Sequence, residues 1–223
     1  MKITALLPMK SHSERVPNKN MKDFNGSPLY HVIVEVLQKS AYINRIVVNT
    51  DSESLAHDAT KNFEHLHIIK RPERIRGDFV SMNTIIAYDL SQLEGEHFLQ
   101  THSTNPLLQT ETIDDAIEAY FHNLGTYDSL FSVTRQQTRL YWENGRPINH
   151  VPKKLVRTQD LPLVYEENSN FYLFSKKSFV DAGGSRIGSK PQMFEINKLE
   201  AVDIDEPEDW EIAELLYKTR ANK

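Results

Sequence analysis

Cysteine is absent from this chain of 223 residues. Disulfide bonds, thiol catalysis and cysteine-ligated metals are therefore excluded, and no framework of a secreted disulfide protein is present. Long apolar runs are also missing. The apolar stretch that opens the chain, residues 3–7, is too short for a signal peptide, and no later run approaches the length of a membrane span. These absences predict a cytoplasmic protein without a membrane partner.

An excess of positive charge is missing too. The 26 basic residues are outnumbered by 31 acidic ones, which gives a net charge of −5. Nucleic-acid binding through a broad basic face is therefore not expected. Hydrophobic residues make up 39% and charged residues 26% of the chain, a balance typical of globular proteins. At this length we predict one domain spanning residues 1–223.

Short apolar segments alternate with helical patterns through the first 134 residues. Strands are predicted at 3–7, 45–51, 67–70, 97–101 and 129–134, and helices at 29–39, 52–63, 82–93 and 110–124. This alternation with short links is typical of a parallel sheet covered by helices, an α/β fold. Pro8 is expected to end the first strand.

The alternation stops between residues 135 and 165, where short extended pieces and turns follow one another. We expect this segment to leave the sheet as an insertion that contacts a partner subunit. A strand at 171–175 and a turn at Gly183-Gly184 follow. The last helix is predicted to begin at Pro207, with Asp205 or Glu206 as its cap.

The loop after the first strand, residues 7–20, contains no glycine. This excludes both the dinucleotide-binding fingerprint and the P-loop. Ligands of parallel α/β sheets nevertheless bind beyond the carboxyl ends of the strands, where this loop lies. Its cations Lys10, Arg15 and Lys19 suit a triphosphate of high negative charge. The alternative interpretation is a solvated basic turn.

A second group of charged residues stands near the end of the chain, in the segment Asp203-Ile204-Asp205. In an extended segment, residues two apart point to the same side, so the two carboxylates converge. Oxygen ligands in this arrangement suit Mg²⁺, which takes one or two carboxylates together with phosphate oxygens. Alternatively, Asp205 serves only as the helix cap, although capping does not explain Asp203.

Other catalytic patterns are missing from the sequence. The nine histidines show no metal-ligand spacing, which argues against a zinc site. No grouping of serine, histidine and acid of the nucleophile-elbow type is present. Residues 71–78 and 157–170 gather arginines and amide side chains, and either segment suits a ligand site or a plain surface loop.

The basic loop and the acidic pair, in this order, resemble one family: the cytidylyltransferases that make CMP-activated acidic sugars. These include CMP-acylneuraminate synthetases and, more distantly, 3-deoxy-manno-octulosonate cytidylyltransferases. The similarity runs nearly end to end. The family motif I-P-A-R-x-G-S-K-x-(I/L)-P-x-K-N lies on residues 7–20, where Ser13, Pro17, Lys19 and Asn20 match it. Lys10 takes the place of the motif's arginine, and Glu14 takes the place of its first lysine. Arg15 resembles the arginine in the loop of the octulosonate branch.

Further motifs of the family lie along the chain. Thr50-Asp51 resembles its T-D after the second strand, and Arg71-Pro72 with Asp78 resembles its R-P-x-x-(L)-x-x-D stretch. Residues 102–106 lie on Q-(A/P)-T-S-P, so that His102 takes the place of a glutamine. Residues 157–168 follow R-x-Q-x-x-P-x-x-Y-x-x-N, and residues 203–209 match D-I-D-x-P-x-D.

The resemblance implies a three-layer α/β/α, Rossmann-like nucleotidyltransferase fold. It also implies attack by the anomeric hydroxyl of an acidic 2-keto sugar on the α-phosphorus of CTP, giving CMP-sugar and pyrophosphate, with Mg²⁺ as cofactor. The implied catalytic residues are Arg15, Lys19, Asp203 and Asp205, of which the two aspartates bind the metal. The implied nucleotide-binding residues are Lys10, Ser13, Asn20, Asp51 and Arg71, and the implied sugar-binding residues are Gln100, His102, Thr104, Asn105, Arg157, Gln159 and Asn168.

A homodimer is implied as well, in which the insertion at 135–165 reaches the neighbour's sugar site. Two other functions stay open on the sequence. One is a nucleotidyltransferase for a different nucleotide or sugar, although such enzymes usually have a glycine-rich first loop. The other is a binding protein that lost turnover, suggested by the altered residues Lys10, Glu14 and His102.

Overall fold

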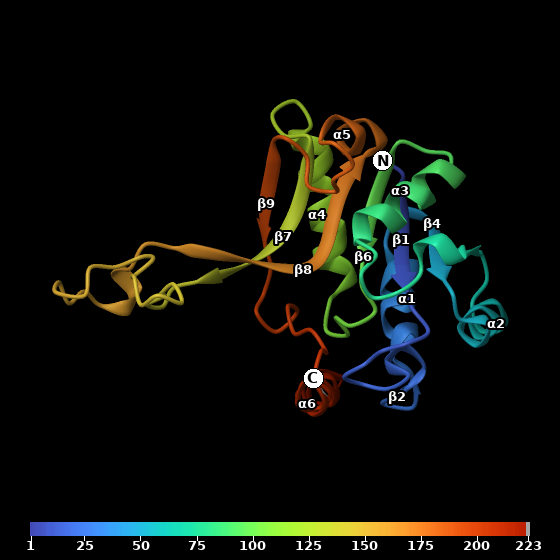
Figure 1. Ribbon diagram of the computed structural model, residues 1–223, viewed down its shortest axis with the longest axis horizontal. Helices are drawn as coiled ribbons and strands as arrows, with labels where there is room; N and C mark the ends of the chain where they lie inside the picture. Colours follow the sequence, from blue (N-terminus) through green and yellow to red (C-terminus); the bar gives the residue numbers. More distant parts are fainter. Residues whose placement is uncertain (222–223) are drawn as a thin grey trace.

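A sheet of seven strands forms the centre of the molecule in a computed structural model that describes residues 1–221 (Figure 1). The strands lie in the order β5-β4-β1-β6-β8-β7-β9. β8 runs antiparallel to β6 and β7, and the remaining pairs of this sheet are parallel. The strand bounds are β1 Ile3–Met9, β4 Ile43–Thr50, β5 Leu66–Lys70, β6 His97–Thr101, β7 Ser129–Gln136, β8 Val164–Ser175 and β9 Pro191–Glu195.

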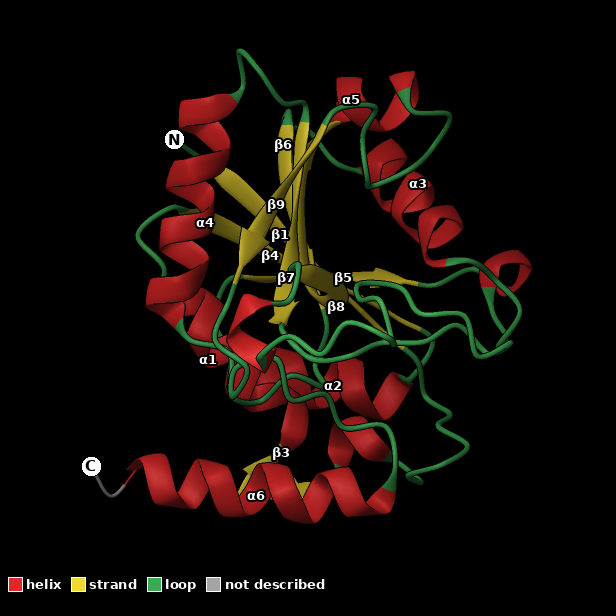
Figure 2. Cartoon of the chain, turned by 90° about the vertical axis from the view of Figure 1, so that its left-hand side faces the viewer, coloured by secondary structure: helices red, strands yellow, loops and turns green. Residues whose placement is uncertain are grey.

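Helices cover both faces of this sheet (Figure 2). On one face lie α1 (Leu29–Lys39) and α4 (Thr110–Asn123), and α2 (Glu53–Asn62) adds Leu55 to the same core. On the other face lie α3 (Met82–Gln92) and α5 (Lys176–Asp181), where Ile86 packs in a core with Phe98 of β6. The predicted three-layer α/β/α fold with a mostly parallel sheet is thereby confirmed.

A third, smaller core joins the two ends of the chain. It contains Val16 of the first loop, Phe24 of the short hairpin β2 (Asp23–Phe24) and β3 (Ser27–Pro28), and Trp210 of α6 (Pro207–Ala221). Ile204, between the two predicted metal-binding aspartates, is fully buried in the same core. Apolar packing therefore fixes the first loop against the segment that precedes α6.

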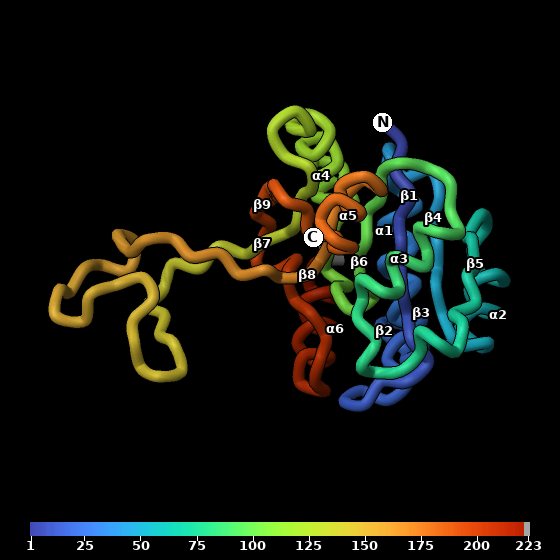
Figure 3. Tube along the Cα trace, turned by 45° about the horizontal axis from the view of Figure 1, so that its top comes forward, coloured from blue at the N-terminus to red at the C-terminus, as the bar shows by residue number. Residues whose placement is uncertain are grey.

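Residues 137–163, here called the arm, leave the sheet between β7 and β8. The outer halves of these strands pair as a two-stranded ribbon, from Val133 to Gln136 on β7. The arm extends from this ribbon away from the other elements in both views (Figures 1 and 3). It holds the short 3-10 helix η3 (Thr158–Asp160) and exposes Trp142, Val151 and Leu155. The expected insertion at 135–165 corresponds closely to the arm, while its dimer contacts stay a prediction.

Two expectations about elements need correction, and two elements were missed. Pro8 does not end β1, which continues to Met9. Pairing of β1 with β6 stops at Leu6, so the last part of β1 has a partner on one side only and tolerates a residue without an N–H. The strand expected at 171–175 begins at Val164, because the polar residues before it form the exposed ribbon. The edge strand β9 and the helix α5 were not predicted.

Among residues 1–221, no helix is both long enough and apolar enough to cross a membrane.

Candidate active site

A cleft of about 240 Å³ opens beside the carboxyl end of β1. This is the place where parallel α/β sheets bind ligands. Apolar side chains from the start of α3 line one part of its wall, with Met82 and Ile85 among them. The cleft brings together seven residues predicted from the sequence: Lys10, Ser13, Lys19, Asn20, Arg71, His102 and Thr104.

The turn that aims Lys19 into this cleft is made without glycine. Asn18 adopts a φ of 53°, in the left-handed region that asparagine tolerates better than most residues. Its carbonyl oxygen accepts hydrogen bonds from the N–H groups of Met21 and Lys22, which closes the 3-10 helix η1 (Lys19–Met21). The first loop therefore folds back on itself and directs the Lys19 side chain toward the C-terminal segment.

The side chain of Lys19 connects the first loop to the segment that precedes α6. Only 9% of the residue is exposed, so the alternative of a solvated basic turn is wrong at this position. Its Nζ donates a hydrogen bond to the carbonyl oxygen of Ile204 at 2.5 Å and lies 3.4 Å from Oδ1 of Asp205. The predicted meeting of a basic loop and an acidic pair is thus present in the structure.

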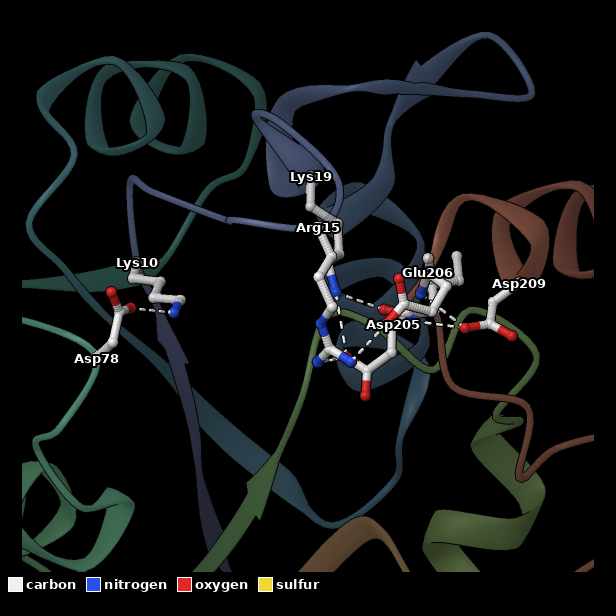
Figure 4. A network of polar contacts seen from close by, with 8 residues as sticks. Lys10, Arg15, Lys19, Asp78, Asp205, Glu206 and Asp209 are labelled. Atoms are coloured by element: carbon white, nitrogen blue, oxygen red, sulfur yellow. Dashed lines mark hydrogen bonds and ion pairs between the residues drawn. The ribbon is translucent and has the colours of Figure 1, made fainter.

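Arg15 approaches the same carboxylate from the solvent side (Figure 4). Its Nη2 lies 3.0 Å from Oδ1 of Asp205, and its Nη1 donates to Oε1 of Glu206 at 2.9 Å. These two carboxylates raise the pKa of the Arg15 guanidinium above its usual value. Arg15 and its partners are half exposed, so the contacts are worth little energy and are open to competition from another anion.

The helix cap of α6 is a different carboxylate from the ones expected. Oδ2 of Asp209, in the first turn, accepts hydrogen bonds from the backbone N–H groups of Asp205 at 3.0 Å and Glu206 at 2.7 Å. This is one half of a capping box. The expectation that Asp205 or Glu206 caps the helix is therefore wrong, and the Asp205 carboxylate stays turned toward Arg15 and Lys19 (Figure 4).

Asp203 is the more enclosed of the two predicted metal ligands. Burial raises the pKa of its carboxyl, and the neighbouring Asp205 carboxylate acts in the same direction, while hydrogen bonding to Thr104 and the charge of Lys19 oppose the shift. Its Oδ1 is buried and has no hydrogen-bond partner among the described residues. A buried carboxylate oxygen without a partner is costly, unless a ligand completes it.

Lys10 stands apart from the other two cations of the loop. Its Nζ pairs with Oδ1 of Asp78 at 2.5 Å, on the opposite side of the cleft from Lys19 (Figure 4). Lys10 lowers the pKa of the Asp78 carboxyl through this hydrogen bond and its charge. Lys10 and Lys19 thus line the cleft from two sides, and Arg15 shares the Asp205 carboxylate with Lys19 outside that lining, so the three predicted cations do not form one cluster.

Two predicted nucleotide-binding residues hold the loop in shape. The amide of Asn20 donates to the carbonyl oxygen of Lys10 at 3.1 Å and accepts from the hydroxyl of Ser103 at 2.5 Å. Oδ1 of Asp51, after β4, accepts the backbone N–H of Ser11 at 2.7 Å. Asn20 lines the cleft, whereas Asp51 lies outside its lining. The polar atoms of both residues therefore fix the backbone on which Lys10 stands.

Arg71 belongs to a buried network that sequence reasoning found only in part. Its Nε donates to Oδ1 of Asn49 at 2.7 Å, and its Nη2 donates to the carbonyl oxygens of Met9 and Asn49. Nδ2 of Asn49 donates in turn to Asp89 of α3 at 2.5 Å. Burial raises the pKa of Asp89 to about 7, against the effects of Asn49 and Arg71. Asn49 and Asp89 belong to no recognised motif, so neither could be predicted.

The predicted sugar-binding residues of β6 and the loop after it fall into two groups, one lining the cleft and one buried. His102 and Thr104 line the cleft, whereas Gln100 and Asn105 are buried beneath it. Nε2 of Gln100 lies 3.1 Å from Nε2 of His102, and Oε1 of Gln100 accepts a hydrogen bond from Arg186. Arg186, on the loop between α5 and β9, was not predicted, because no motif marks it.

Three predicted sugar-binding residues lie away from this cleft within the chain. Arg157 and Gln159 are on the arm, where the Arg157 guanidinium forms two hydrogen bonds with Asp160. Asn168 lies at the base of the ribbon, where it accepts from Ser132 at 2.6 Å and donates to Thr134 at 2.8 Å. The fold of one chain does not bring these residues to the cleft, and their roles stay predictions.

A comparison with protein families decides the class. The model of the family described as "Cytidylyltransferase" matches residues 4–222. The chain belongs to this cytidylyltransferase family. The resemblance found in the first loop, the acidic pair and the segments between them is thereby confirmed, and the protein is placed among nucleotidyltransferases.

Characterised relatives of this cytidylyltransferase act on acidic sugars, according to their names. It is 29% identical to N-acylneuraminate cytidylyltransferase A of Danio rerio over 95% of this chain and 50% of the relative. It is 25% identical to the pseudaminic acid cytidylyltransferase of Campylobacter jejuni, and 27% identical to the CMP-N,N'-diacetyllegionaminic acid synthase of Legionella pneumophila. Each of these two matches covers 98% of this chain and 97% of the relative. The chain thus spans half the length of the fish relative and nearly all of the bacterial ones.

Solved structures of low sequence identity share the fold of this cytidylyltransferase. The structure of CMP:2-keto-3-deoxy-manno-octonic acid synthetase complexed with CTP aligns with a TM-score of 0.73 at 11% identity, covering 99% of this chain and 100% of that one. A 4-diphosphocytidyl-2C-methyl-D-erythritol synthase from Anaerococcus prevotii aligns with a TM-score of 0.68 at 13% identity, covering 97% and 96%. The predicted Rossmann-like nucleotidyltransferase fold agrees with both.

The donor set of this cytidylyltransferase fits Mg²⁺. Asp203 and Asp205 offer hard oxygen ligands, and one of these oxygens is buried without a partner. In the part of the chain that is described, no group of three histidine, cysteine or acidic side chains is arranged to hold a metal by itself. A pair of carboxylates suffices for Mg²⁺, because this ion usually takes its other ligands from substrate phosphates and water.

Proposed function

We propose that this protein couples CTP to an acidic 2-keto sugar, with release of pyrophosphate and formation of a CMP-sugar. One observation carries the proposal: Lys19 of the first loop contacts Ile204 and Asp205 of the D-I-D segment beside the cleft. This contact joins a site suited to phosphates to a site suited to a divalent cation. The substrates named for the relatives supply the nucleotide and the class of sugar.

The cations of the first loop have the role of phosphate ligands in this proposal. Transfer of a nucleotidyl group requires mostly positioning and neutralisation of charge, so little covalent chemistry is asked of the protein. Lys10 and Lys19 approach the cleft from two sides, which suits the two ends of a triphosphate. Arg15 is held by weak, exposed ion pairs, so the triphosphate competes with Asp205 and Glu206 for its guanidinium.

Asp203 and Asp205 would hold Mg²⁺ together with phosphate oxygens of the bound nucleotide. When bound, the ion supplies Lewis-acid polarisation of the α-phosphate and orientation of the nucleophile. The chain's own part is to hold both carboxylates on one side of an extended segment, with Ile204 anchored in the core behind them. Lys19 keeps Asp205 in place through its contacts with the same segment.

The sugar site is proposed to be completed by a second copy of the chain. His102 and Thr104 line the cleft, while Arg157 and Gln159 belong to the arm, which extends away from the other elements. The arm exposes large apolar side chains, among them Leu155 at 90% and Val151 at 63%, which suits burial against a partner. A homodimer whose arms exchange would bring Arg157 to the sugar carboxylate of the neighbouring cleft. The cytoplasmic location stays a prediction.

The proposal is tested by measuring pyrophosphate release from CTP and Mg²⁺ with a panel of 2-keto sugar acids. Mass spectrometry of the products identifies the CMP-sugar formed. CTP is expected to give a higher rate of pyrophosphate release than ATP, GTP or UTP. Preference for UTP or GTP would favour a nucleotidyltransferase of another specificity. Tight CTP binding without turnover on any sugar acid would favour a binding protein that lost its activity.

A further inference from the structure

Arg186 is a half-buried cation that the proposed function does not yet use. It stands on the loop between α5 and β9, and burial lowers the pKa of its guanidinium. The centre of this group lies 3.7 Å from the centre of the Tyr172 ring, which holds it by a cation–π contact. Its Nη1 donates a hydrogen bond to Oε1 of Gln100. The arginine is thereby tied to β6, directly beneath the cleft wall.

The direction of this hydrogen bond fixes the orientation of the Gln100 amide. A guanidinium has donors and no acceptor, so the atom of Gln100 that faces Arg186 must be the oxygen. The amide nitrogen of Gln100 then faces the carbonyl oxygen of Thr101 at 2.8 Å, which accepts only. Two independent neighbours therefore require the same orientation of this side chain.

The same orientation determines the protonation of His102. The amide nitrogen of Gln100 lies 3.1 Å from Nε2 of His102, and this nitrogen carries only hydrogens to donate. Nε2 of His102 must then accept, so the ring carries its proton on Nδ1 and is neutral. Burial and the charge of Arg186 favour the neutral ring, since they lower the pKa of His102 to about 4 against the effect of Asp205.

We propose that Arg186 and Gln100 are positioning residues that fix His102 as a neutral Nδ1–H donor on the cleft wall, where it binds an oxygen of the acidic sugar. The position of His102 in the cleft lining supports the contact with the sugar: Nε2 is taken by Gln100, and Nδ1 has no hydrogen-bond partner among the described residues. The sugar contact rests on the proposed function. The chain of hydrogen bonds from Arg186 through Gln100 to His102, here called the relay, is independent of it.

Nitrogen-15 NMR of the histidine rings tests the relay in the protein without substrates. At neutral pH, His102 is expected to show a protonated Nδ1 and an unprotonated Nε2, and the His102→Asn variant assigns its signals among the nine histidines. A His102 ring protonated on Nε2 would overturn the relay. This measurement needs no activity, so its result does not depend on the substrate.

Two variants separate the relay from simple packing. In Gln100→Glu, the side chain accepts from both neighbours, so the proton of His102 is expected to move to Nε2. In Arg186→Lys, a donor-only cation remains and the Nδ1–H form is expected to persist. Arg186→Met leaves only the Thr101 carbonyl oxygen to orient the Gln100 amide, so a weaker preference with some Nε2–H form is expected. Unchanged spectra in Gln100→Glu, with the fold verified by circular dichroism, would contradict the proposal.

The sugar contact is tested by steady-state kinetics with an active sugar acid. His102→Phe is expected to raise the KM for the sugar about tenfold, the scale of one lost hydrogen bond, and to leave the KM for CTP within about twofold. An unchanged KM for the sugar would overturn this half of the proposal. Absence of turnover on every sugar acid, with the expected Nδ1–H spectrum, would refute the proposed function and leave the relay supported.

Discussion

Three charged side chains in or near the cleft have unfavourable surroundings in the free protein. Asp203 keeps a buried oxygen without a partner, Lys19 is almost fully buried, and Asp89 is buried with one carboxylate oxygen unpaired. Each of these arrangements is unfavourable in an empty protein. For Asp203 and Lys19, a bound divalent cation and a polyphosphate would supply the missing opposite charges, whereas the raised pKa of Asp89 lets its carboxyl take up a proton instead. The residues of highest cost are therefore the ones whose replacement is most informative.

Replacement of Asp203 by asparagine tests the metal assignment. The amide keeps the size of the side chain and removes the negative charge, so the turnover of the Mg²⁺-dependent reaction is expected to fall about 100-fold or more. The matched control is Glu208→Gln, which changes an exposed carboxylate of the same segment. Pyrophosphate release is the measurement. Similar rates in Asp203→Asn and the control would remove Asp203 from the site.

The buried carboxyl of Asp89 leads to a prediction about how the stability of the protein depends on pH. Its pKa is raised to about 7 in the folded protein, above the usual value of an unfolded aspartate. The stability that the protonated carboxyl contributes is complete below the unfolded pKa and is lost as the pH rises through about 7. The free energy of unfolding, measured with urea, is thus expected to decline between about pH 4 and about pH 7, by on the order of 1 kcal/mol per pH unit at most.

The variant Asp89→Asn should flatten this decline, because the amide does not titrate. Asp115→Asn, on the exposed side of α4, is the control and should leave the slope as in the unchanged protein. Equal slopes in all three proteins would show that Asp89 ionises normally.

At the scale of elements, apolar periodicity predicted most of the fold. The helices α1 to α4 and the strands β1, β4, β5 and β6 lie within a few residues of their expected bounds, because their buried faces require regular apolar spacing. Pro191 to Glu195 was missed, since an edge strand of mixed composition carries no such pattern. The outer part of the ribbon at the base of the arm was missed for a related reason: Arg135 and residues 165–167 are exposed, so no apolar alternation is imposed there.

The helix cap formed by Asp209 leads to a prediction about stability at the scale of elements. Its carboxylate caps α6 and also holds the backbone of Asp205, so Asp209→Ala should lower stability by about 1 kcal/mol. For a chain of this size, that corresponds to a fall in Tm of roughly 2–4 °C. Glu208→Ala, at the neighbouring exposed position, should leave Tm unchanged within error. A Tm equal to that control would mean that the cap contributes nothing.

At the scale of the whole molecule, the predicted site residues lie in two regions, the cleft and the arm, which are apart within one chain. The cleft, with Lys19 at its side, could be predicted, because strand ends and the D-I-D segment meet at one edge of the sheet. The position of Arg157 could not, because the arm has no core of its own that fixes its direction from sequence. Neither Arg186 nor Asp89 was predicted, since each acts through a partner distant in sequence and belongs to no motif.

Subunit mixing tests whether the arm serves a neighbouring cleft. Asp203→Asn and Arg157→Ala are each expected to be nearly inactive alone. If Arg157 acts in the partner's site, a mixed dimer contains one cleft with an intact Asp203 and an intact arm. Unfolding and refolding an equimolar mixture should then restore roughly a quarter of the sites, as expected for random pairing in a two-fold dimer.

The exposed side chain of Leu155 supplies the control for this mixing experiment. Leu155→Glu places a charge on the apolar part of the arm, so subunits that also carry it are expected to sediment as monomers and to show no restored activity. Activity that stays absent in the mixture, while sedimentation shows dimers, would mean that Arg157 serves a cleft of its own chain. Restored activity requires exchange of the arms, because no rearrangement within one subunit repairs either variant.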